Sequence, residues 1–214
     1  EHVFGVLLSL THSLERYHEA VRAGDWQQST DFCMLQFPVR ELSAMTLGIV
    51  GYGALGQGVA RIAREFGMTV LVSARPGTDS VPDDRVAFDE LLAKADVISL
   101  HCPLNDATRE LFGAREFAAM KDSAILINTA RGGLVESRAL TDALASGQIA
   151  AAAIDVLPQE PPADGDPLLD YRGDNLVVTP HIAWATDEAR QNAIDELAGN
   201  TRAFLNGTER NRVI

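Results

Sequence analysis

Three side chains in the second half of the sequence have the types needed to reduce a carbonyl group. Arg131 can clamp a carboxylate and polarise a neighbouring carbonyl, because its guanidinium presents a planar fork of donors. His181 can protonate the oxygen as hydride arrives at the carbon. Glu160 can stabilise the protonated imidazole and keep an acid available near neutral pH. Taken singly, each also fits a structural role: a surface ion pair, a solvated loop charge or a satisfied histidine.

A glycine-rich turn is the second motif with functional chemistry. Gly51, Gly53 and Gly56 match the pattern G-x-G-x-x-G, after a predicted strand and at the start of a predicted helix. The first glycine permits the tight turn, the second lets backbone approach a pyrophosphate, and the third allows close packing of helix and strand. Amides at the helix start, including those of Ala54 and Leu55, can hold phosphates. We therefore expect a dinucleotide site here; a tight turn without ligand is the alternative.

The end of the next predicted strand bears on which dinucleotide is bound. An acidic residue about 20 positions after the glycines usually binds the ribose 2′-hydroxyl of NAD. Ser73, Ala74 and Arg75 stand there instead. A guanidinium can bind a 2′-phosphate bidentately and Ser73 can add a hydrogen bond, so NADP(H) is favoured over NAD(H). A solvated Arg75 with relaxed cofactor choice is the alternative, and three nearby carboxylates would weaken the preference: Asp79, Asp83 and Asp84.

The elements that must position these residues form an alternating pattern. We predict strands at 46–50, 69–73, 96–100, 124–128, 149–154 and 176–179. We predict helices at 55–66, 88–93, 114–120, 136–145 and 186–205. Almost continuously apolar strands that alternate with helices indicate a parallel sheet covered on both faces. The predicted fold class is α/β, a Rossmann-type doubly wound parallel sheet with flanking interdomain helices.

The segment before this pattern is predicted to be one helix and an arm. From Val3 to Val21 apolar residues recur at spacings of three and four, and Gly24 is a candidate C-cap. Residues 25–45 show little periodicity, and the Pro- and Asp-rich stretch 158–167 predicts a rigid surface loop. We expect a dinucleotide-binding domain over 1–185, with a leading interdomain helix and a dimerisation arm, and a C-terminal helix over 186–214.

The remaining histidines and cysteines are assigned no catalytic role. Cys102 has no base or cation partner in sequence, so we expect it to pack beside the cofactor rather than act as a nucleophile. His101 is expected to satisfy a strand-end hydrogen bond. Three further histidines fall in the first predicted helix and are expected at the surface or at an interface: His2, His12 and His18.

Composition and charge restrict the partners. The 214 residues are 46% apolar and 22% charged, which is typical of a soluble globular protein. A net charge of −12 argues against nucleic acid and against an anionic membrane surface, although a local basic pocket for a small anion remains possible. No apolar run is long enough to span a membrane. Two cysteines without a CxxC or Cys/His cluster predict no metal site and a reducing, cytoplasmic compartment.

A series of motifs resembles the D-isomer-specific 2-hydroxyacid dehydrogenase family over essentially the whole chain. The motifs lie at 46–56, 96–104, 126–135, 154–161 and 179–184. The resemblance implies that Arg131 binds the substrate carboxylate and that Glu160 and His181 form the acid pair. The arm at 26–38 and the run 181–184 are similar to the glycerate dehydrogenase (hydroxypyruvate reductase) branch. This implies a small 2-keto or 2-hydroxy acid such as hydroxypyruvate, D-glycerate or glyoxylate, and places Trp184 at the substrate pocket or its partner-subunit wall.

The motifs and the resemblance together give a set of cofactor-binding residues, with NADP favoured and NAD possible. Within this set Thr129, Ala130, Asp155 and Ala183 are expected along the nicotinamide half. The full set is Gly51, Gly53, Ala54, Leu55, Gly56, Ser73, Ala74, Arg75, His101, Cys102, Pro103, Thr108, Thr129, Ala130, Arg131, Asp155, His181 and Ala183.

The sequence departs from the family in two ways. The acidic ribose-binding residue is missing, and so is an N-terminal substrate-domain segment of roughly a third of the family chain. Because the sequence starts without Met and directly in a helical pattern, we expect an upstream segment in the natural protein. We expect this chain to bind cofactor, to have little activity alone and to form a homodimer through its first helix and the arm at 25–40.

Two other functions stay open at this point. The same scaffold could oxidise phosphite or formate, with Arg131 holding a smaller anion. The chain could also be a non-catalytic dinucleotide-sensing module whose oligomeric state responds to the cofactor.

Overall fold

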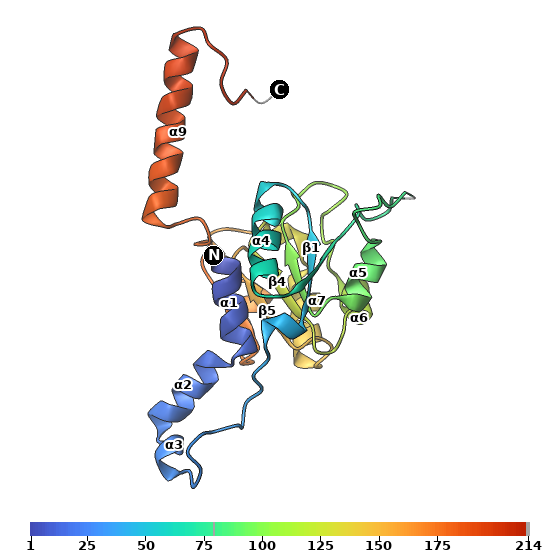
Figure 1. Ribbon diagram of the computed structural model, residues 1–214, viewed down its shortest axis with the longest axis vertical. Coiled ribbons are helices and arrows are strands. Elements are labelled where there is room, and N and C mark those ends of the chain that lie inside the picture. Colours follow the sequence, from blue (N-terminus) through green and yellow to red (C-terminus); the bar gives the residue numbers. More distant parts are fainter. Residues whose placement is uncertain (79, 213–214) are drawn as a thin grey trace. The chain divides into compact units, whose positions relative to one another are not determined.

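The computed structural model describes residues 1–78 and 80–212, and within them six parallel strands form one sheet (Figure 1). The order of the strands across the sheet is β2-β1-β3-β4-β5-β6, so the direction of winding reverses between β1 and β3. This confirms the predicted doubly wound α/β fold. The strands are β1 (Thr46–Val50), β2 (Thr69–Val72), β3 (Val97–Leu100), β4 (Ile125–Asn128), β5 (Ala151–Ile154) and β6 (Leu176–Val178).

The register of the strands brings their carboxyl ends to one edge. Val50 pairs with Leu100, Leu100 with Asn128, and Asn128 with Ile154. The loops after β1, β3, β4 and β5 therefore start from neighbouring points. In an open α/β sheet this edge is where ligands bind.

Helices cover both faces of the sheet, which explains the almost continuously apolar strands. One face is covered by α1 (His2–Thr11) and α4 (Ala54–Glu65), whose apolar side chains share a core with Ile49 and Ile127. The other face is covered by α5 (Phe88–Lys94), α6 (Ala114–Ala119), α7 (Ser137–Ala145) and the short α8 (Pro167–Asp170). The one-turn helix α8 follows the predicted 158–167 loop and was not predicted.

The prediction of a single N-terminal helix is wrong, because the helix is interrupted at Ser13. α1 ends at Thr11 and α2 (Leu14–Ala23) starts after Ser13, whose φ of 50° lies in the left-handed region. The Ser13 hydroxyl donates to the Pro38 carbonyl over 2.8 Å. Gly24, with φ of 88°, ends α2 as predicted.

The predicted arm packs back against α2. It begins with α3 (Asp25–Gln28) and ends with a 3₁₀ turn, η1 (Leu42–Ala44). The Tyr17 hydroxyl donates to the Phe37 carbonyl over 2.8 Å, and the two rings meet edge to face. Phe32 and Leu35 in the arm are 91% and 85% exposed.

The chain divides into two compact units, of which the first is residues 1–180 and the second begins at His181. Helix α9 (Asp187–Leu205) of the second unit has Thr186 as its N-cap, and the Thr186 hydroxyl accepts from the Ala189 amide. The division expected from the sequence, at 185/186, stays a prediction. None of the helices in residues 1–78 and 80–212 is long and apolar enough to cross a membrane.

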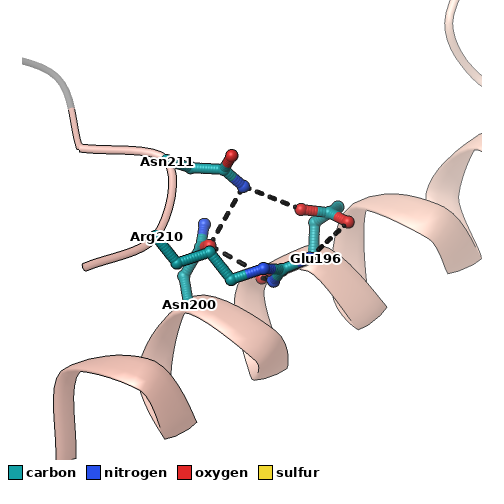
Figure 2. Close-up of polar contacts among 4 residues, drawn as sticks. All are labelled: Glu196, Asn200, Arg210 and Asn211. Carbon is teal, nitrogen blue, oxygen red and sulfur yellow. Dashed lines mark hydrogen bonds and ion pairs between the residues drawn. The ribbon is translucent and has the colours of Figure 1, made fainter. Parts of the chain in front are cut away.

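The segment after α9 folds back onto that helix, as Figure 2 shows. Arg210 donates to the Glu196 carboxylate over 2.8 Å, and Asn211 donates to the same carboxylate over 2.9 Å and to Asn200 over 3.1 Å. Gly199 makes room for this contact, since an added Cβ there would lie 2.0 Å from an Arg210 nitrogen.

Candidate dinucleotide and substrate site

The three glycines of the turn after β1 face different surroundings. Gly51 has φ of 96°, and a Cβ there would lie 2.4 Å from the amide nitrogen of Cys102. A Cβ on Gly56 would lie 2.2 Å from the Gly51 carbonyl oxygen. A Cβ on Gly53 would meet no atom within 4 Å. The outer two glycines are therefore required by the protein itself, whereas the middle one leaves open space beside the backbone.

This turn fits the diphosphate of a dinucleotide. α4 begins at Ala54 with Gly53 as its N-cap, and no side chain caps its first amides. Such amides have no partner within the helix and are the groups that bind phosphate. Leu55 in the first turn is 76% exposed. An anion approaching Gly53 would find donors and no obstructing side chain.

The residues after β2 separate into buried and exposed groups. Ser73 and Ala74 are each 6% exposed, and the Ser73 hydroxyl donates to the Ala74 carbonyl over 2.6 Å. Ser73 would have to exchange this bond to bind a phosphate. Arg75 is exposed.

A cavity beside Arg75 contains a second guanidinium that the sequence analysis missed. Its lining includes Arg75 and Thr78 from the loop after β2, and Arg115 from α6. Arg115 is paired with Asp89 at 3.4 Å and with Glu116 at 3.0 Å. Of the three nearby carboxylates, Asp84 pairs with Arg85, Asp83 is exposed, and Asp79 lies outside the described residues.

The loop after β3 forms the wall behind Gly51. The His101 amide donates to the Val50 carbonyl over 2.7 Å, and its Nε2 lies 2.9 Å from the Ser99 hydroxyl, which confirms the expected strand-end hydrogen bond. Burial lowers the pKa of His101 to about 4, so its ring is neutral at pH 7.

Cys102 and the residues after it continue this wall. Burial raises the pKa of the Cys102 thiol, which agrees with a packing role rather than a nucleophile. The Thr108 hydroxyl donates to the Pro103 carbonyl over 2.7 Å and closes the loop.

The loop after β4 takes its shape from a side chain that was not predicted as a site residue. Asn128 is fully buried; its amide group donates to the Arg131 carbonyl over 2.9 Å and accepts from the Ala130 amide over 3.1 Å. Thr129 lies inside this closed turn. The exposed Arg131 guanidinium donates to the Ala130 carbonyl over 2.6 Å.

The loops after β4 and β5 touch at a glycine. A Cβ on Gly132 would lie 2.0 Å from the carbonyl carbon of Leu157. The Leu157 amide in turn donates to the Glu160 carboxylate over 2.8 Å. Leu157 therefore links the loop that carries Arg131 to the loop that carries Glu160.

At the end of β5 lies a buried carboxylate that contacts distant parts of the chain. Asp155 is 2% exposed and accepts from the Thr179 hydroxyl over 2.5 Å. Thr179 Oγ1 also lies 3.1 Å from Nε2 of His2. The sequence analysis expected His2 at the surface or at an interface; its side chain is 20% exposed, and the packing of α1 on the sheet brings it to this edge.

The last predicted site residues belong to the second unit. His181 is its first residue and has φ of 55°. Ala183 follows, and Trp184 is 56% exposed. In residues 1–78 and 80–212, His, Cys, Asp and Glu side chains form no group of three or more that could hold a metal ion.

Comparisons with known proteins bear on what this edge binds. The family model for the D-isomer specific 2-hydroxyacid dehydrogenase NAD binding domain matches residues 4–183. A glycerate dehydrogenase of Methylorubrum extorquens is 46% identical over 214 residues, which are 100% of this chain and 67% of that protein.

Solved structures show the same fold with nicotinamide cofactors. D-lactate dehydrogenase from Lactobacillus jensenii, with NAD+, matches with a TM-score of 0.81 and 31% identity, over 97% of this chain and 65% of that one. An acyclic imino acid reductase in complex with NADPH and D-Arg matches with a TM-score of 0.84 and 30% identity, over 100% of this chain and 66% of that one. The chain spans about two thirds of the length of the curated relatives it matches. The resemblance is confirmed: the chain belongs to the D-isomer-specific 2-hydroxyacid dehydrogenase family.

Proposed function

We propose that this chain is the dinucleotide-binding part of an oxidoreductase that transfers hydride between NADP(H) and a small 2-keto or 2-hydroxy acid. The open backbone at Gly53, on the same sheet edge as the exposed Arg131, carries the proposal. Hydroxypyruvate with D-glycerate, or glyoxylate, is the substrate we favour. The name of the Methylorubrum relative, glycerate dehydrogenase, supports this choice.

The roles of the residues follow from their chemistry. A bound nicotinamide cofactor supplies the hydride for the carbonyl carbon. Arg131 binds the substrate carboxylate and orients the carbonyl, and the bonds from Asn128 hold its backbone in place. His181 donates a proton to the carbonyl oxygen, and Glu160 stabilises the protonated ring. Trp184 contributes to the substrate pocket.

The preference for NADP(H) is the finer part of the proposal. The position after β2 that would carry the acidic ribose-binding residue is occupied by the buried Ala74, and the exposed Arg75 follows it. Arg75 would bind the 2′-phosphate; Arg115 lines the same cavity, where it is paired with the carboxylates of Asp89 and Glu116. The two relatives solved with NAD+ and with NADPH support a nicotinamide cofactor of either kind.

We also propose that the protein forms a cytoplasmic homodimer through α1, α2 and the arm at 25–40. The exposed Phe32 and Leu35 in that arm support a contact with a second copy. Sedimentation of the chain with and without cofactor tests this. A monomer under all conditions contradicts it.

Calorimetric titration with NADPH and NADH tests the cofactor proposal. We expect NADPH to bind at least about tenfold more tightly, a difference of about 1.4 kcal/mol. Arg75→Ala should remove this preference by weakening NADPH alone. Arg64→Ala, an exposed arginine in the last turn of α4, is the matched control and should change neither affinity. Equal affinities in the wild-type chain would overturn the role of Arg75.

A substrate panel tests the reaction in the intact enzyme, because we expect this chain to have little activity alone. Hydroxypyruvate and glyoxylate should be reduced, and phosphite and formate should not be oxidised. Turnover of phosphite or formate would assign a different reaction to the same scaffold. Cofactor-dependent dimerisation without any turnover would indicate a dinucleotide-sensing module instead.

A further inference from the structure

A chain of hydrogen bonds joins the start of α1 to the buried carboxylate after β5. Nε2 of His2 lies 3.1 Å from Thr179 Oγ1. The Thr179 hydroxyl donates to Asp155 Oδ1 over 2.5 Å. His2 and Thr179 are 177 positions apart in the sequence, so only the folded sheet brings them together.

The direction of these bonds follows from the number of hydrogens. A threonine hydroxyl carries one hydrogen, and an ionised carboxylate only accepts. Because the Thr179 hydrogen goes to Asp155, the contact with His2 requires an N–H on the imidazole. His2 Nε2 therefore donates to Thr179, and the bonds run from His2 through Thr179 to Asp155. The same Nε2 lies 3.8 Å from Asp155 Oδ1.

Burial decides what this chain of bonds does. The Asp155 side chain is 0% exposed and that of His2 is 20% exposed. A buried carboxylate keeps the orientation in which donors meet it, because leaving that orientation costs the free energy of an unsatisfied charge. α1 itself is anchored by apolar side chains in the core, among them Phe4 and Leu7, so the donor on His2 is not needed to hold the helix.

We propose that His2 is a positioning residue that acts through Thr179 to fix the Asp155 carboxylate where it meets the nicotinamide half of the cofactor. This inference rests on the proposed function and on the expectation, from the family resemblance, that Asp155 lies along that half. In this proposal His2 acts on the cofactor only through its contact with Thr179. Any side chain that places an N–H donor at the same point should replace it.

Two ligands that differ only in the nicotinamide part separate positioning from general stability. Calorimetry measures the binding affinities of two pairs of ligands. The first pair is NADPH and 2′-phospho-ADP-ribose, and the second is NADH and ADP-ribose. His2→Leu removes the donor, and we expect it to weaken dinucleotide binding about tenfold. The ligands without nicotinamide should bind within about twofold of the wild-type affinity.

Two further variants sharpen the result. His2→Gln keeps an N–H donor and should recover most of the dinucleotide affinity. His12→Leu, at the other end of α1, is the matched control and should leave all four affinities unchanged.

Thr179→Val tests the middle of the chain of bonds, and it still decides the matter if His2→Leu does not fold. It should weaken dinucleotide binding by a similar factor. The double variant His2→Leu/Thr179→Val should bind the dinucleotide no more weakly than either single variant. Equal weakening of both ligands of a pair would reduce His2 to a structural role. Unchanged dinucleotide affinity would also overturn the inference. If the wild-type chain binds none of the four ligands, the proposed function fails and the inference fails with it.

Discussion

The turn after β1 and the loop after β4 lie at the same edge of the sheet but are built differently. The turn depends on two glycines, Gly51 and Gly56, because an added Cβ at either would overlap neighbouring backbone. The loop is made by the buried side chain of Asn128, which bonds to the Ala130 amide and the Arg131 carbonyl. The turn exposes backbone donors, which suits a diphosphate, whereas the loop exposes a guanidinium, which suits a carboxylate.

The turn and the loop are disrupted by different kinds of substitution. A backbone turn fails when any atom is added at a contact point. A loop held by side-chain hydrogen bonds fails when a partner is removed, because a buried donor is then left unsatisfied. This difference can be measured.

Gly51→Ala should have the largest effect. The methyl group would overlap the backbone of Cys102 at a positive φ, so we expect a loss of about 3 kcal/mol or more in the free energy of unfolding. Urea denaturation followed by circular dichroism measures it. A change below about 1 kcal/mol would show that the turn can relax away from the β3 loop.

The wall of the turn should be sensitive to acid through His101. Its folded pKa of about 4 lies below the ordinary value of 6.5, so between these values the unfolded chain binds a proton that the folded chain does not. Lowering the pH through this window should cost up to about 3 kcal/mol of stability from this group. His101→Gln should lose less stability between pH 7 and pH 4 in urea denaturation. Parallel pH profiles of the two proteins would contradict the burial of a neutral ring.

Asn128→Leu should break the β4 loop at a smaller cost. The Ala130 amide and the Arg131 carbonyl lose their partner, and we expect a loss of about 2 kcal/mol in stability. The Michaelis constant for the keto acid should also rise in the intact enzyme, because the Arg131 backbone is released. Asn105→Leu, an exposed asparagine that caps a turn, is the control and should cost less. Equal losses for the two variants would remove the special role of burial.

Gly53→Ala should have the smallest effect of the four substitutions, and it should act on dinucleotide binding rather than on stability. Its methyl group meets no protein atom, so the free energy of unfolding should stay within about 0.5 kcal/mol of wild type. Dinucleotide binding should weaken about tenfold, or about 1.4 kcal/mol, because the methyl group occupies the approach to the phosphates. Calorimetry and urea denaturation on the same sample give both numbers. Unchanged dinucleotide affinity would contradict a diphosphate site at this glycine.

Much of the fold was predictable because its signals are local. β1 was predicted at 46–50 and found there, and the glycine pattern matched a turn of the expected geometry. The other strands and α4 differ from their predicted bounds by one or two residues at an end. The helix break at Ser13 was missed because it depends on a hydrogen bond to Pro38, which no periodicity within the helix records.

The site was predictable only as far as its residues follow strand ends. The sequence by itself determined that Gly51, Arg131 and Asp155 lie at one edge, because parallel strands share the direction of their carboxyl ends. The tertiary structure decided that Asn128 closes the Arg131 loop, that Gly132 admits the β5 loop and that His2 reaches Thr179. These contacts join residues from separate elements, and their distances depend on how helices pack on the sheet rather than on any spacing along the chain.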